Sequence, residues 1–319
     1  MILELFVNDL SIHGQFPNVA SFDRAIADLM AMRNLAKRYG RELFCHRNVS
    51  SSQVTRDMKM QQAVQCLQKD QTRALMSWFT REGPYWEDDQ HHSSDDYLEC
   101  LGRVVTDSAV GEAAFRCFWS FDSRLISLNP SDWTFSPLDV WWRSTSENDR
   151  KIEINNYFNR EAFENLLRAS PLPVASWDDL EAMSRRQFGR LLFDDKAFEP
   201  LGPLPFNANA AQRIQRLLEI LHKINSYTNS DGKRNDQGNE LYQQYFTGKK
   251  SLFSDSSDSE KDDFKQDLTF KHPEKYGKTL FCSWHGKVKT YQIRIHFSWP
   301  EQAGSPFHIV YIGPKITKR

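Results

Sequence analysis

In the first half of the chain, short apolar runs alternate with stretches whose apolar residues recur every three or four positions. A short apolar run between turn-prone residues predicts a buried strand, whereas the wider spacing predicts one apolar face of a helix. The runs predict strands at 2–7, 42–46, 101–106, 125–128, 138–142 and 152–156. The spacing predicts helices at 21–39, 55–79, 110–118 and 161–168. Because strands alternate with helices, we expect a mixed α/β domain over residues 1–170.

Prolines concentrate in the next segment, around one predicted helix near 177–192. The prolines are Pro171, Pro173, Pro200, Pro203 and Pro205. Since proline interrupts helices and cannot donate a hydrogen bond to a sheet, we interpret residues 171–211 as a proline-rich connection.

Residues 212–319 predict helices followed by a small antiparallel sheet. Helical spacing is clear at 212–224 and again at 240–246. The acidic, serine-rich segment 254–267 is interpreted as a solvated linker. Alternating apolar and polar residues predict strands at 280–284, 291–299 and 307–312, with a turn at 285–287. The whole chain is therefore predicted to have an α+β fold.

Positive charge gathers at the C-terminal end. Residues 271–319 contain nine Lys and Arg against two Glu, a net charge of +7, although the whole chain carries −1. A basic sheet on an otherwise acidic chain indicates an anionic partner, and RNA or DNA is the partner we expect.

The predicted strands place basic and titratable side chains on one face of the sheet, because side chains alternate along a strand. His285, His296 and Arg294 are candidate catalytic residues, with the histidines as proton-transfer groups. Candidate phosphate contacts are Lys287, Lys289, Lys315, Lys318 and Arg319. We favour a sheet that binds nucleic acid without cleaving it, and a nuclease that uses the two histidines is the alternative.

The helix at 212–224, the strand RIHF (294–297) and the terminal IGPK (312–315) together resemble small bacterial toxins of the RelE/HigB type. The string WHGK…RIHF…YIGPK is also similar to uncharacterised bacterial proteins found near phage-defence genes. These resemblances imply a nucleic-acid-directed component of a bacterial antiviral defence or toxin-type system, working with a partner protein of the same system. A non-catalytic interaction subunit of a multi-protein defence complex is the alternative that they leave open.

Acidic residues and histidines cluster between positions 87 and 112. They are Glu87, Asp88, His91, His92, Asp95, Asp96, Asp107 and Glu112. Carboxylates and imidazoles can hold a divalent ion, so a metal-dependent nuclease is a further alternative. We favour a solvated loop or helix start over 86–99. Asp107 or Ser108 is expected to cap the helix at 110–118, with capping as the favoured role of Asp107, and we expect no bound metal.

Other features exclude several classes of protein. Glycine-rich phosphate loops, dinucleotide-binding motifs and zinc-protease motifs are missing from the sequence, so we expect no cofactor. The five cysteines are scattered, which is typical of a reducing compartment. The chain begins without a basic, then apolar, leader and contains no apolar run long enough to span a bilayer. We therefore expect a soluble cytoplasmic protein that does not contact a membrane.

Overall fold

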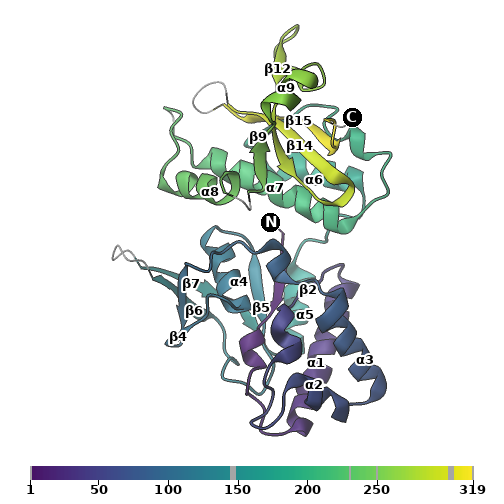
Figure 1. The fold of residues 1–319 in the computed structure, drawn as a ribbon, viewed down its shortest axis with the longest axis vertical. Helices are drawn as coiled ribbons and strands as arrows, with labels where there is room; N and C mark the ends of the chain where they lie inside the picture. The colour runs from purple at the N-terminus through teal and green to yellow at the C-terminus, as the bar shows by residue number, and fades with distance from the viewer. Residues whose placement is uncertain (1, 144–148, 230, 249–250, 301–304, 318–319) are drawn as a thin grey trace. The chain divides into compact units, whose positions relative to one another are not determined.

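The computed structural model describes residues 2–143, 149–229, 231–248, 251–300 and 305–317. The chain divides into two compact units, Met1–Pro173 and Val174–Arg319 (Figure 1). Helices and several separate sheets occur along the chain, which confirms the predicted α+β class. The lone helix expected in the proline-rich segment 171–211 is α6 (Trp177–Gln187), and it belongs to the second unit together with the short strand β9 (Leu191–Phe193).

A four-stranded parallel sheet lies at the centre of the first unit. Its order is β2 (Leu43–Phe44), β1 (Glu4–Val7), β5 (Ser123–Ile126) and β8 (Asn156–Tyr157). All four residues of β1 are buried, as expected for a strand covered on both faces. The helices that flank the sheet are α1 (Val19–Arg38), α4 (Ala109–Phe118) and α5 (Arg160–Ala169). The α4 helix packs against β1 and β5, and α1 packs against α5.

The helix predicted over 55–79 is wrong as one continuous element. The chain instead forms α2 (Met60–Ala63), η3 (Val64–Cys66), α3 (Lys69–Ser77) and a π-helical turn, η4 (Trp78–Glu82). The backbone becomes extended at Leu67 and Gln68. The bend lets Met60, Val64 and Trp78 all reach the same core cluster.

A second, antiparallel sheet of the first unit has the order β4 (Arg103–Val104), β3 (Tyr97–Cys100), β6 (Leu138–Arg143) and β7 (Arg150–Ile154). The strand predicted at 101–106 is misplaced, because Leu101 and Gly102 form the turn between β3 and β4 with φ values of 53° and 69°. The strand β3 begins at Tyr97, inside the segment 86–99 that was expected to be a solvated loop.

The second unit contains a five-stranded sheet with the order β10-β13-β14-β15-β9. Its remaining strands are β10 (Phe253–Asp255), β13 (Trp284–Lys287), β14 (Ile293–Ser298) and β15 (Phe307–Pro314). Four strands pair antiparallel, as predicted, and β9 adds a parallel edge beside β15. The helices α7 (Ala208–Ser226) and α8 (Asp236–Phe246) belong to the same unit, and α7 contacts β15 and β9 (Figure 1).

One face of this sheet is apolar. Ile293, Ile295 and Phe297 of β14 are fully buried, as expected for the apolar positions of the alternating strand predicted at 291–299. The turn predicted at 285–287 is wrong, because these residues lie within β13. Gly286 fits a strand here because a Cβ atom at this position would lie 3.0 Å from Phe253 and 3.1 Å from Leu217 of α7.

The opposite face of the sheet is covered by the segment that connects β10 to β13. This segment forms α9 (Asp258–Asp263) and a two-stranded ribbon of β11 (Thr269–Lys271) and β12 (Thr279–Phe281) (Figure 1). Phe270 of the ribbon lies 6.2 Å from the ring of Tyr311 on β15. The acidic segment 254–267, interpreted from the sequence as a linker, is therefore structured: Ser257 caps α9 and shares a capping box with Glu260.

Candidate functional site

The candidate residues of the C-terminal sheet occupy two neighbouring rows on its polar face. His285 of β13 lies opposite His296 of β14, and Lys287 lies opposite Arg294. Residues two apart on a strand share a face, so the two pairs point to the same side. The structure thus brings together the candidate catalytic residues and one candidate phosphate contact, although two of them lie in a strand where the sequence predicted a turn.

The two histidines lie beneath the ribbon. The ring centroids of His285 and His296 are 5.3 Å apart, and only 8% and 1% of these residues is exposed. Phe270 lies against His296, with the two ring centroids 6.1 Å apart. The Nδ1 atom of His296 lies 3.0 Å from the carbonyl oxygen of Cys282. Neither imidazole is therefore placed where a large substrate could contact it.

Burial also determines the protonation of these histidines. It lowers the pKa of His285 to about 4 and the pKa of His296 to about 4, because the charged imidazolium loses its contact with water. Both rings are consequently neutral at physiological pH. A general acid must carry a proton at the working pH, so neither histidine can donate one at neutral pH in this arrangement.

Lys287 and Arg294 form a pair of like charges at the end of the β13–β14 hairpin. Among the described residues neither forms an ion pair, although Arg294 Nη1 donates a hydrogen bond of 3.0 Å to the carbonyl of Ile293. Burial lowers the pKa of Lys287, and the charge of Arg294 lowers it further. Burial likewise lowers the pKa of Arg294, against the opposing influence of Glu260. This row therefore carries positive charge without a carboxylate in direct contact.

The remaining predicted phosphate contacts differ from one another. Lys289 is exposed in the loop that follows β13. Lys315 is bound to the acidic segment, since its Nζ atom lies 2.8 Å from Oε1 of Glu260. Thr317 donates a hydrogen bond of 3.0 Å to the same oxygen, and Lys315 and Thr317 help to lower the pKa of Glu260 to about 2. Lys318 and Arg319 lie outside the described residues.

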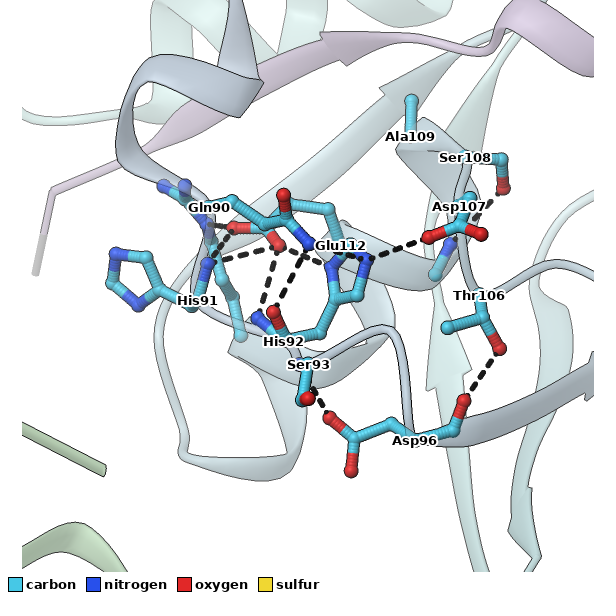
Figure 2. A network of polar contacts seen from close by, with 12 residues as sticks. Gln90, His91, His92, Ser93, Asp96, Thr106, Asp107, Ser108, Ala109 and Glu112 are labelled. Atoms are coloured by element: carbon cyan, nitrogen blue, oxygen red, sulfur yellow. Dashed lines mark hydrogen bonds and ion pairs between the residues drawn. The ribbon is translucent and has the colours of Figure 1, made fainter. Parts of the chain in front are cut away.

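The first unit contains a buried polar network around Glu112 of α4 (Figure 2). Its carboxylate accepts hydrogen bonds from the backbone N–H groups of His91 at 3.0 Å and His92 at 3.3 Å. It also lies 2.6 Å from Nδ1 of His92 and 2.6 Å from Nε of Arg116. His91 and His92 are 3% exposed, so the solvated loop expected over 86–99 is wrong at its centre. The segment is polar in sequence because it supplies partners to a buried carboxylate.

Charges in this network compensate one another. Arg116 also donates to Glu4 at 2.9 Å and to the carbonyl of Asp89 at 2.7 Å. Burial would raise the pKa of Glu112, but Arg116 and His92 outweigh burial and lower this pKa to about 2. Burial would lower the pKa of Arg116, and Glu4 and Glu112 raise it instead. We interpret the network as a structural element of the fold.

Several acids of 87–112 have partners within the protein. Among the described residues, no group of three or more His, Cys, Asp or Glu side chains is arranged to hold a metal ion. Asp88 pairs with Arg47, and Asp96 accepts a hydrogen bond of 2.7 Å from the N–H of Ser93. Of the two predicted helix caps, Ser108 is confirmed as the N-cap of α4, since its hydroxyl accepts from the N–H of Gly111, and the capping role favoured for Asp107 is wrong.

A series of hydrogen-bonded polar side chains, which the sequence did not predict, lies at the carboxyl ends of the parallel strands. Asn8, just after β1, donates to Ser127 at 2.9 Å, and Ser127 donates to Asn156 of β8 at 2.8 Å. A cavity of about 190 Å³ adjoins this edge, and Ser127, Asp28 and Arg160 are among its lining residues. Ligands of open parallel sheets bind at this edge. The signal in the sequence was an Asn or Ser directly after an apolar run.

No known protein family, curated protein or solved structure matches this chain in the three comparisons that we made. The resemblance to RelE/HigB toxins therefore stays a prediction. Across the part of the chain that the structure describes, no helix combines the length and the apolar character needed to cross a bilayer.

Proposed function

We propose that the protein binds nucleic acid through the loop end of the β13–β14 hairpin, where Lys287, Lys289 and Arg294 lie. The observation that carries the proposal is the direct opposition of Lys287 and Arg294 across two paired strands. Like charges in this position destabilise a sheet. A bound phosphate would turn the repulsion into two attractive contacts.

The chemistry of the two side chains suits a phosphate. The guanidinium of arginine can donate two parallel hydrogen bonds to phosphate oxygens, and the lysine ammonium adds a compact charge. Both side chains are half-buried, so their charges are screened less by water and salt than those of fully exposed residues. Lys289 is exposed two residues further along the chain and supplies a third cation for an adjacent phosphate.

The proposal is for binding and does not include cleavage by the histidines. His285 and His296 share the face with Lys287 and Arg294, but both are buried and stay neutral, and His296 lies against Phe270. On the basis of the sequence resemblance, the proposal includes a role for this binding in a bacterial defence or toxin-type system.

One observation favours a second candidate function, a subunit that docks on an acidic partner protein. Lys315 already binds a carboxylate, that of Glu260, at 2.8 Å. A carboxylate-rich segment of another protein could make the same contact with Lys287 and Arg294. Both ligands would occupy the same cations, so direct measurement of binding to a labelled oligonucleotide and to a labelled acidic peptide distinguishes the two candidates.

The test compares the affinity of wild type and a Lys287→Ala/Arg294→Ala variant for fluorescently labelled RNA and DNA oligonucleotides, measured by anisotropy. We expect the variant to bind at least about tenfold more weakly, since each charge-assisted hydrogen bond contributes about 1.5–3 kcal/mol. A matched control, Arg186→Ala/Lys233→Ala, removes the same charge from exposed positions of the same unit outside the sheet. Equal affinities for the two variants would contradict the proposed surface.

A further inference from the structure

The loop between β13 and β14 has an unusual backbone. Tyr291 and Gln292 both adopt left-handed conformations, with φ values of 54° and 51°. Residues with a Cβ atom rarely adopt this region, because the side chain crowds the neighbouring carbonyl. Along the described residues, this is the one place where two consecutive non-glycine residues do so.

Backbone hydrogen bonds hold the loop in this strained form. The N–H of Gln292 donates to the carbonyl of Lys289 at 3.0 Å, and its own carbonyl accepts from the N–H of Lys315 at 3.0 Å. Val288 and Ile293 close the base of the loop with a further bond of 3.0 Å. The conformation is thus fixed by the same strands that carry the basic residues.

The strain places a large aromatic side chain at the surface. Tyr291 is 38% exposed, and it lies two residues from Lys289 and three from Arg294 in the same hairpin. Burying the ring would stabilise the fold, so an exposed tyrosine in an unfavourable backbone conformation needs another explanation. Strained backbone conformations cluster at sites that contact a ligand.

We infer that Tyr291 stacks on an unpaired base of a single-stranded nucleic acid whose phosphates contact Lys287, Lys289 and Arg294. The inference rests on the proposed function and adds the class of ligand. Proteins that bind single strands combine cations along the backbone with aromatic rings that stack on the bases. A duplex offers no free base face to Tyr291, because its bases stack on each other.

The test uses the full chain and three labelled ligands: a single-stranded oligonucleotide, the same strand with abasic sites, and its duplex. Tyr291→Ala should weaken binding of the single strand by about 5- to 150-fold, the range measured for one stacked base. The same substitution should leave binding of the duplex and of the abasic strand unchanged. Tyr291→Phe keeps the ring and should retain the wild-type affinity.

A further variant separates stacking from folding. Tyr291→Gly relieves the backbone strain, so we expect it to be at least as stable as wild type and to bind the single strand as weakly as Tyr291→Ala. If Tyr291→Ala binds the single strand as tightly as wild type while Lys287→Ala/Arg294→Ala binds it weakly, the stacking inference fails and the proposed surface stands. Stronger binding of the duplex would also overturn the inference. If no variant and no wild type binds nucleic acid, both proposals fail.

Discussion

The carboxylate of Glu260 and the ammonium of Lys315 form an ion pair of 2.8 Å on the polar face of the C-terminal sheet. Glu260 comes from the acidic segment that covers this face, and its charge also acts on Arg294. The protein thus supplies one anion of its own to a cationic surface. A nucleic-acid phosphate would have to compete with this carboxylate for Lys315.

The first prediction follows from that competition. Glu260→Gln removes the charge but keeps the side-chain oxygen that accepts from Ser257 in the capping box of α9. We expect the variant to bind a labelled oligonucleotide several-fold more tightly than wild type. Lys315 becomes available to a phosphate, and the surface loses a negative charge that repels phosphates. Asp258→Asn is the matched control, since it removes the same charge from a fully exposed side chain of the same helix. An equal effect of the two substitutions would argue against a specific role of Glu260.

A second prediction concerns the buried network of the first unit. Glu112→Gln should lower the free energy of unfolding by about 3 kcal/mol, because it leaves buried Arg116 with Glu4 as its remaining carboxylate partner. Urea titration measures this change. Asp107→Asn, whose side chain is 78% exposed, should change the same quantity by less than about 0.5 kcal/mol. A small decrease in the free energy of unfolding of Glu112→Gln would show that the network is not a stabilising element.

A third prediction is the effect of pH on the second unit. A histidine whose pKa is lower in the folded protein than in the unfolded chain binds a proton less readily when folded. For His296 the folded pKa is about 4 and the unfolded pKa about 6.5. Its contribution to stability is therefore complete above pH of about 6.5 and is lost as the pH falls from there towards 4.

Urea titrations at pH values from 7 to 4 measure this loss. His296→Gln cannot bind a proton, so its stability should fall less steeply over this range than that of wild type. His13→Gln makes the same change at an exposed position of the first unit and should follow the wild-type curve. Parallel curves for wild type and His296→Gln would contradict the assignment.

A fourth prediction tests the close packing at Gly286. Gly286→Ala should destabilise the protein by about 1–3 kcal/mol, because the new methyl group would lie 3.0 Å from Phe253 and 3.1 Å from Leu217. Gly189→Ala is the control, since no atom lies within 4 Å of a Cβ at that position. Thermal unfolding of both variants measures the difference. Equal midpoints would mean that the strand has room for a side chain.

Local patterns in the sequence predicted much of the fold. Helical spacing predicted α1, α4 and α7, and alternation predicted the buried face of β14, because these patterns depend on neighbours one or two turns away. The sequence predicted a turn at Gly286, since glycine between polar residues usually marks one. The structure shows a strand there, and the reason is Phe253, a residue more than thirty positions away.

Contacts between residues far apart in the sequence also determine the candidate sites. Opposition of Lys287 and Arg294 was not predicted, because the sequence placed Lys287 in a turn; the extent of β13 and its register came only from the structure. The burial of His91 and His92 depends on Glu112, twenty or more residues later in the chain. Likewise, the cover over His296 comes from Phe270 in a segment whose composition predicted a linker. Contacts between distant segments leave no periodic signal in a single sequence.

The most direct test of the account is the salt dependence of binding to a labelled single-stranded oligonucleotide between 50 and 200 mM salt. Three phosphate contacts, at Lys287, Lys289 and Arg294, predict that the logarithm of the association constant falls linearly with the logarithm of the salt concentration, with a slope of about −2. Lys287→Ala/Arg294→Ala should reduce the magnitude of the slope to about 0.7. An affinity that does not change with salt, or no binding at all, would contradict the proposal.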